Sequence, residues 1–195
     1  MRNFALATAL LVAATLAGCG APIKERFFTL SSGATPAGAG AAATYSVAVG
    51  PVSVPELVDR PQLVLRVGPN EVMIAEQSRW AEPLKIEIPR VIAGNLSQLL
   101  NARVSAYPQT TGSDADYKVT VDVQRFESTL NDAATLEALW TVRPVKGASK
   151  SGRLMVREAT GAPGYDALVV SHGRALAAVS RDIAEAIRSM SGAAK

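Results

Sequence analysis

The residue type best suited to covalent chemistry in this chain is cysteine, and it occurs once, as Cys19. Cys19 ends the sequence Leu16-Ala17-Gly18-Cys19, which directly follows an apolar stretch at residues 4–16. A thiolate is the strongest nucleophile among the side chains, so one cysteine at a fixed place is suited to forming a thioether. Because the sequence holds no second cysteine, a disulfide within the chain is excluded.

The other residues with catalytic or metal-binding potential do not form a recognisable set. The single histidine, His172, lies on the apolar face of an expected helix, which is typical of a packed core residue. The alternative is a Ser-His-Asp hydrolase that uses His172. Asp114 and Asp116 are close in sequence, but calcium takes six to eight oxygen ligands and no loop here supplies them in order. The sequence therefore predicts neither catalytic residues nor a metal site.

Residues 1–18 have the organisation of a secretory signal peptide. Arg2 supplies a positive start, residues 4–16 form the apolar region, and small residues precede the cleavage point. The ending Leu-Ala-Gly-Cys resembles the bacterial lipobox. This resemblance implies cleavage before Cys19, a lipid on its sulfur and acylation of the new N-terminus, so the covalent lipid is the only expected cofactor.

Two alternatives to a lipoprotein signal stay open. The first is an ordinary signal peptide in which Cys19 falls by chance. The second is an uncleaved transmembrane helix, which the length disfavours because a bilayer core requires roughly 20 apolar residues. A lipoprotein carries several acyl chains, which anchor more durably than one. Lipoproteins kept in the inner membrane typically carry Asp after the cysteine, so Gly20 favours the periplasmic face of the outer membrane.

Size and charge restrict the class of the mature protein. Removing residues 1–18 from the 195-residue chain leaves 177 residues, enough for one domain with its own core. Without Arg2, 19 Lys and Arg face 17 Asp and Glu, a formal charge of +2. These charges form no basic block, so the sequence predicts no binding to nucleic acid.

Two amphipathic helices are expected. The first begins near residues 80–83 and carries one apolar stripe: Leu84, Ile88, Ile92, Leu96 and Leu99. Pro89 is expected to kink or restart it. Asn95 shares the stripe and is interpreted as a buried amide with hydrogen-bond partners, with a ligand site as the alternative. The second helix begins at Tyr165 and carries the longer stripe Leu168, Val169, His172, Leu176, Val179, Ile183 and Ile187.

Strand patterns occupy most of the remaining chain. They fall at residues 26–30, 45–49, 63–67, 71–75, 104–107, 117–126, 136–142 and 153–158. The alternation is clearest at 117–124, and the strand is expected to continue to Phe126, while Gly68-Pro69-Asn70 predicts the turn of a hairpin. Residues 52–62 hold Pro55 and Pro61 and are expected to be an extended, rigid connection.

These patterns predict an α+β fold. About six to seven of these strands are expected to form a largely antiparallel or mixed sheet, and the two helices to pack on one face of it. The expected organisation is a signal peptide at 1–18, a lipidated tether at 19–25, a single periplasmic domain at 26–190 and a frayed tail at 191–195. Residues 31–44, rich in Ala, Gly, Ser and Thr, are expected to form a flexible loop within the domain.

Several short blocks carry a resemblance to a known family. They are Cys19, Phe27-Phe28-Thr29-Leu30, Val49-Gly50-Pro51-Val52, Val58-Asp59-Arg60-Pro61-Gln62, Arg79-Trp80-Ala81-Glu82-Pro83-Leu84 and Ser180-Arg181-Asp182-Ile183-Ala184. In this order they resemble the ABC-type transport auxiliary lipoproteins, whose best-known member is PqiC. The resemblance covers essentially the mature chain.

The resemblance implies a non-enzymatic role. Members of this family are outer-membrane lipoproteins that work with an inner-membrane ABC or permease complex and with an MCE-domain protein that bridges the periplasm. The implied process is lipid transport between membranes, which maintains the envelope. The short tether suits a docking collar beneath the outer membrane, and a homo-oligomeric ring fits such a collar. The alternative is an envelope assembly or scaffold lipoprotein with no part in lipid transport.

Partner contacts are expected at the rigid 50–62 segment and at the corner formed by Arg79 and Trp80. The candidate residues are Gly50, Pro51, Asp59, Arg60, Pro61, Gln62, Arg79 and Trp80. Arg60 and Arg79 can each make a charge-assisted hydrogen bond, either to a partner or within the fold. Trp80 and Trp140 are interpreted as packing residues, with an anchor in a protein–protein contact as the alternative.

Cys19→Ala tests the anchor. The domain is expected to fold, but the protein is released from the membrane or left unprocessed, because the thioether can no longer form. Membrane fractionation and mass spectrometry of the N-terminus measure both outcomes. Mature protein that stays bound to the membrane without Cys19 would contradict the prediction.

Overall fold

A computed structural model describes residues 24–34, 42–108 and 114–192. The predicted lipidation site Cys19, the middle of the expected 31–44 loop and the last three residues lie outside these ranges. Among the described residues, none of the helices is long and apolar enough to cross a bilayer.

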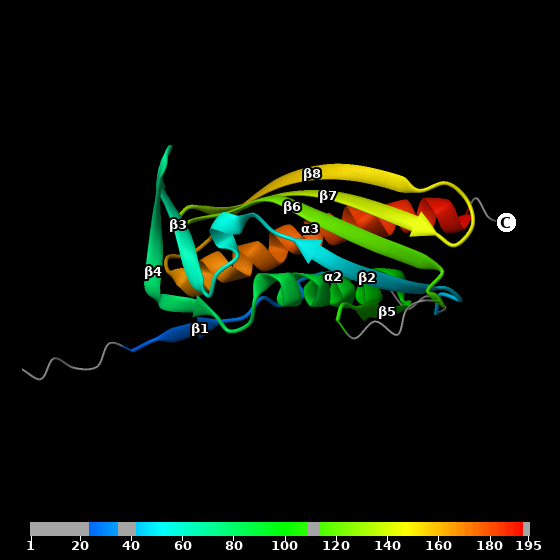
Figure 1. The fold of residues 1–195 in the computed structure, drawn as a ribbon, viewed down its shortest axis with the longest axis horizontal. Coiled ribbons are helices and arrows are strands. Elements are labelled where there is room, and N and C mark those ends of the chain that lie inside the picture. Colours follow the sequence, from blue (N-terminus) through cyan, green and yellow to red (C-terminus); the bar gives the residue numbers. More distant parts are fainter. Residues whose placement is uncertain (1–23, 35–41, 109–113, 193–195) are drawn as a thin grey trace, which may run out of the picture.

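The described chain contains eight strands and two long helices (Figure 1). The strands are β1 (Arg26–Phe28), β2 (Ser46–Ser53), β3 (Gln62–Gly68), β4 (Glu71–Trp80), β5 (Arg103–Ala106), β6 (Tyr117–Thr129), β7 (Ala133–Pro144) and β8 (Lys150–Ala159). The helices are α2 (Leu84–Leu100) and α3 (Tyr165–Gly192), and a short 3-10 turn, η1 (Glu56–Val58), follows β2.

The long strand β6 organises the sheet. One edge of β6 pairs in parallel with β2 and, further along, at Ser128 with Leu65 of β3. Its other edge pairs antiparallel with β7, and β7 pairs antiparallel with β8. β4 pairs antiparallel with β3 and parallel with β1, and β5 pairs parallel with β2. The expected α+β class with a mixed sheet is confirmed, with eight strands rather than six to seven.

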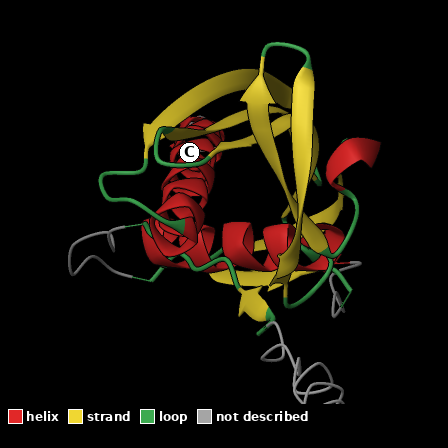
Figure 2. Ribbon diagram, turned by 90° about the vertical axis from the view of Figure 1, so that its left-hand side faces the viewer, coloured by secondary structure: helices red, strands yellow, loops and turns green. Residues whose placement is uncertain are grey.

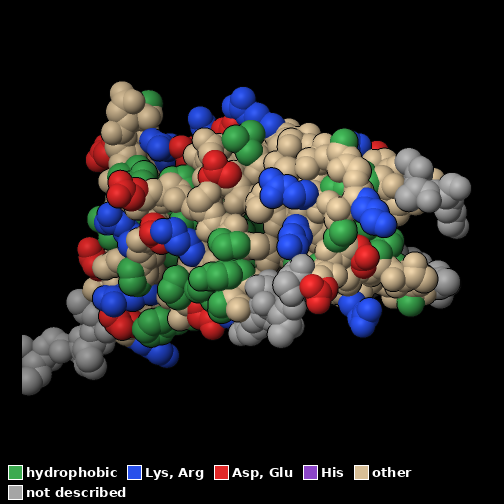
Figure 3. Space-filling view, turned by 45° about the vertical axis from the view of Figure 1, so that its right-hand side comes forward, with side chains coloured by type: hydrophobic (Ala, Val, Ile, Leu, Met, Phe, Trp, Pro, Cys, Tyr) green, Lys and Arg blue, Asp and Glu red, His purple; other side chains and the backbone are tan. Residues whose placement is uncertain are grey.

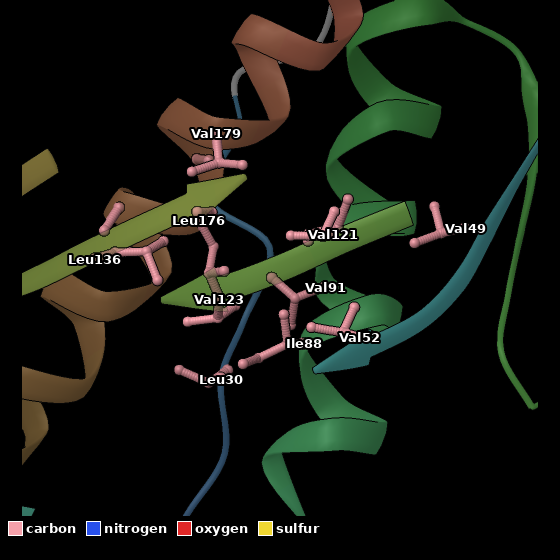
Figure 4. Packing of buried hydrophobic residues seen from close by; sticks show 14 of the residues in the cluster. Leu30, Val49, Val52, Ile88, Val91, Val121, Val123, Leu136, Leu176 and Val179 are labelled. Carbon is pink, nitrogen blue, oxygen red and sulfur yellow. The ribbon is translucent and has the colours of Figure 1, made fainter. Parts of the chain in front are cut away.

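The strands curve over the two helices, which lie on the same side of the sheet (Figure 2). α2 lies under β2 and β5, while α3 lies under β7 and β8. Alternate residues of β6, such as Val121 and Val123, point from the sheet toward Ile88 of α2 and Leu176 of α3 (Figure 4). Burial of this apolar interface is the main source of stability, because the chain has no disulfide.

The ends of α2 follow from the sequence. Pro83 directly precedes the helix, where a missing backbone N–H costs nothing, and Asn101 ends it in the left-handed conformation with φ 49°. Pro89 is buried within one continuous helix, so the expected restart does not occur. α3 continues to Gly192, beyond residue 190, where the frayed tail was expected to begin.

Several strands extend further than the sequence patterns predict, and β2 and β4 bear on the site. β2 continues through Gly50-Pro51 to Ser53, and its register on β6 shifts between Val49 and Val52. A bulge tolerates proline because the extra residue needs no ladder hydrogen bond. The connection at 52–62 is therefore shorter than expected and includes η1. β4 continues to Trp80 because β1 pairs with its last three residues.

Charged side chains are distributed over the surface. On the face shown in Figure 3, Lys and Arg stand at separate positions with acidic side chains among them. Most ion pairs among the described residues, such as Arg157 with Asp132 at 2.6 Å, join partly exposed side chains. Exposed pairs of this kind contribute little to stability.

Asn95 is fully buried on α2 and has partners on both sides. Its Oδ1 accepts the backbone N–H of Ala34 at 3.1 Å, and its Nδ2 donates to Ser180 Oγ on α3 at 3.2 Å. The interpretation of Asn95 as a hydrogen-bonded core residue is confirmed. The same contact places residues 31–34 of the expected loop against α2.

Glu87 holds the segment after β1 in place. Its Oε1 accepts the backbone N–H of Leu30 at 2.7 Å, while its Oε2 is buried without a partner. Burial disfavours the charged form and raises the pKa of this carboxyl to about 7, although the Leu30 hydrogen bond acts in the opposite direction. Neutral Glu87 is therefore favoured in the folded protein below neutral pH.

Glu87→Gln tests this pKa through the pH dependence of stability. Because the folded-state pKa lies above the unfolded value of 4.5, the contribution of Glu87 to stability is present at low pH and is lost as pH rises from about 4.5 through 7. Relative to the wild type, the Gln variant is expected to gain on the order of 2 kcal/mol in unfolding free energy between pH 5 and pH 8.

Urea denaturation of both proteins at several pH values measures this difference. Comparing the two proteins at each pH cancels the contribution of His172, which titrates in both. A stability difference that stays constant from pH 5 to pH 8 would contradict the raised pKa.

Candidate functional site

A groove of about 400 Å³ opens where three segments meet at one end of the domain. The segments are β1, the residues before β3, and the corner between β4 and α2. The lining residues are Phe27, Asp59, Arg60, Pro61, Arg79, Trp80, Ala81, Glu82 and Pro83. We call these nine residues the groove residues.

Backbone hydrogen bonds hold the three segments together. Trp80 donates its backbone N–H to the carbonyl of Pro61 at 2.7 Å, and Ala81 donates to the carbonyl of Phe28 at 2.8 Å. In the parallel pairing of β1 with β4, Phe27 lies beside Arg79. The groove is thus built on rigid backbone rather than on side-chain contacts alone.

Five of the eight partner-binding residues predicted from the sequence line this groove: Asp59, Arg60, Pro61, Arg79 and Trp80. Gln62 lies next to it at the start of β3, where its Nε2 is 3.3 Å from Glu76 Oε2. Gly50 and Pro51 lie elsewhere, in the bulge of β2. Pro51 lines a separate hollow with Lys85 and Leu139. Whether any of these residues binds a partner stays a prediction.

Phe27 is one of four groove residues that the site prediction missed, together with Ala81, Glu82 and Pro83. Its side chain is 61% exposed, whereas the neighbouring Phe28 is buried at 6%. Successive side chains of a strand point to opposite faces, so two adjacent phenylalanines cannot both face the core. The Phe27-Phe28 pair was therefore a usable signal for an exposed aromatic side chain.

Trp80 forms the base of the groove and belongs to the core. It is only 5% exposed, and its ring meets Phe126 and His172 edge to face, with centroid distances of 6.0 and 6.2 Å. Trp140 is also buried, and its Nε1 donates to Asp182 Oδ2 at 2.8 Å. The interpretation of both tryptophans as packing residues is confirmed.

His172 is a core residue under the groove. Its ring stacks on Phe126 at 4.0 Å, and its Nε2 lies 2.8 Å from Ser128 Oγ. Burial lowers the pKa of His172 to about 3, so the imidazole is neutral near pH 7. Its Nδ1 has no hydrogen-bond partner, and His172 and Ser128 are 1% and 3% exposed. The pair therefore lacks the orienting carboxylate and the substrate access of a hydrolase triad.

The charges around the groove are mostly neutralised within the fold. Asp59 pairs with Lys85 at 2.6 Å, Glu82 with Arg90 at 2.7 Å, and Arg79 with Glu25 at 3.0 Å. Arg60 differs, because no described residue forms an ion pair or hydrogen bond with it, and its buried Nε–H has no acceptor. Within the described part of the chain, no group of three or more His, Cys, Asp and Glu is arranged to hold a metal.

Trp80→Ala tests whether this residue supports the fold or acts as a surface anchor. Because the indole is buried, its removal is expected to lower the unfolding free energy by about 3–5 kcal/mol. Phe27→Ala is the matched control in the same groove and is expected to cost less than about 1 kcal/mol. Thermal melting measures both. A melting temperature nearly unchanged in the Trp80 variant would show that the buried arrangement is wrong.

Comparison with solved structures shows the fold in related proteins. A crystal structure of an uncharacterized protein is 21% identical over 85% of this chain and 99% of its own, with a TM-score of 0.70. Protein XCC0632 from Xanthomonas campestris, described under the family model DUF330, is 20% identical, with a TM-score of 0.65. That match covers 81% of this chain and 92% of the other.

No curated protein sequence matches the chain significantly. A family model does, and it aligns from residue 28 in β1 to residue 184 in α3, which includes almost every groove residue. The model describes an ABC-type transport auxiliary lipoprotein component. The chain therefore belongs to the family of ABC-type transport auxiliary lipoproteins.

Proposed function

We propose that this protein is a lipid-anchored docking subunit on the periplasmic face of the outer membrane. In this role it serves an ABC/MCE-type system that moves lipids between the two membranes, and it receives the end of an MCE-domain protein that bridges the periplasm. Membership in the auxiliary lipoprotein family supports an accessory role rather than a catalytic one. The lipid on Cys19 supplies the anchor.

The observation that carries the proposal is the open groove beside the start of the domain. Phe27 lies only eight residues after Cys19, and seven residues, 19–25, reach at most about 25 Å when fully extended. The anchor would therefore keep the groove close to the membrane surface. A short tether prevents the domain from crossing the periplasm, so a partner from the inner membrane must come to it.

The groove has features of a protein-binding site. Its walls include exposed Phe27 with Pro61 and Pro83, and its rim carries charged side chains. Interfaces typically place aromatic and arginine side chains at their centre and polar groups at their rim. The fold presents this arrangement on rigid elements, which lowers the entropic cost of binding.

Site-specific cross-linking in cells tests the proposal. A photoreactive amino acid at position 27 is expected to cross-link the MCE-domain protein encoded by the same host. The matched control is position 145, because Val145 is 68% exposed and follows β7 at the opposite end of the domain (Figure 1). The control position is expected to give no such product.

Two results would contradict the proposal. Recovery of cell-wall synthases or β-barrel assembly proteins alone would favour an assembly or scaffold role. Equal cross-linking at positions 27 and 145 would show that the groove is not the contact.

A further inference from the structure

Arg60 is the groove residue whose chemistry the fold leaves incomplete. Its Nε–H is buried, yet none of the described residues accepts a hydrogen bond from it. Buried polar groups in folded proteins almost always have partners, so an unpaired guanidinium N–H indicates a missing acceptor. The position is well defined, because the adjacent Pro61 carbonyl accepts the Trp80 backbone N–H.

Charge complementarity favours an acceptor that carries a single negative charge. The other groove charges are each neutralised by a neighbour, as with Arg79 and Glu25 or Asp59 and Lys85. Arg60 therefore leaves about one uncompensated positive charge at the groove. A guanidinium presents parallel N–H groups, which match the two oxygens of one carboxylate.

We propose that the groove binds an extended peptide segment of the partner and that Arg60 holds a carboxylate of that segment. This inference rests on the proposed docking function, since it names what the docked partner presents. The carboxylate is an Asp or Glu side chain or a C-terminus, and an apolar side chain next to it packs against Phe27 and Pro61.

The free edge of β1 favours a peptide. β1 is the terminal strand on its side of the sheet and pairs only with β4 among the described strands. A peptide that adds to a sheet edge gains main-chain hydrogen bonds, and pockets for its side chains supply specificity. The groove lies directly beside Phe27 of this strand.

The size of the groove also favours a peptide over a phospholipid. A volume of about 400 Å³ accommodates a few amino-acid side chains but not two full acyl chains. Its apolar lining is made by Phe27, Pro61, Trp80, Ala81 and Pro83. A phosphate headgroup shares the anionic chemistry, so the experiment must distinguish the two.

The test uses a display library of random ten-residue peptides as the probe and the full mature chain in nanodiscs as the target. Enriched peptides are expected to carry a carboxylate next to an aromatic or aliphatic residue. For an enriched peptide, Arg60→Met is expected to weaken binding by about ten- to a hundredfold. Replacing the peptide carboxylate by an amide is expected to have a similar effect.

Two variants make the result specific. Arg60→Lys keeps the charge but not the paired N–H geometry and is expected to bind with intermediate affinity. Arg125→Met removes an arginine from β6, away from the groove residues, and is expected to bind like the wild type. Melting temperatures of all variants confirm that they fold.

Three results would overturn the inference: no enrichment of carboxylates, unchanged affinity in Arg60→Met, or Arg60-dependent binding of dihexanoyl phosphatidylglycerol in place of any peptide. The last result would assign the groove to a lipid headgroup. If position 27 still cross-links the MCE-domain protein in any of these cases, the docking function stands and only the carboxylate assignment fails.

Discussion

The arrangement of the groove depends on the burial of Trp80 against the core. The indole meets Phe126 of β6 and His172 of α3, and the latter two rings stack at 4.0 Å. These contacts join the end of β4 to the central strand and the longest helix. Because α3 is packed under β7 and β8, the corner that follows Trp80 is fixed relative to the whole sheet. Burial also keeps His172 uncharged, which the apolar stack requires.

Two side chains near β1, the strand that follows the tether, have a buried polar atom without a hydrogen-bond partner. Glu87 binds the backbone after β1 but leaves one oxygen without a donor, while Arg60 leaves its Nε–H without an acceptor. Most other charges in this region are paired at the surface, where pairing contributes little to stability. Of these two residues Arg60 lines the groove, and its unpaired N–H is consistent with a surface that is completed by another molecule.

Much of the fold could be predicted because its signals are local. The alternation at 117–124 predicted β6, and the stripe from Leu168 to Ile187 predicted α3. The end of β4 could not be predicted, because residues 76–79 are polar and become a strand only by pairing with β3 and β1. The groove was foreseen in part, since Arg60 and Trp80 were candidates. The Phe27-Phe28 pair indicates that one of the two rings is exposed, but the pairing of β1 with β4 decides which one, and the unpaired state of Arg60 depends on contacts between distant segments.

Arg60 is the proposed point at which a partner is held. The most direct measurement is a structure of the mature chain bound to the periplasmic part of its MCE-domain partner. We predict a partner carboxylate oxygen about 3 Å from Arg60 Nε, with the partner chain extended alongside β1. A complex in which the partner contacts another face, and the groove beside Phe27 holds no partner residue, would contradict it.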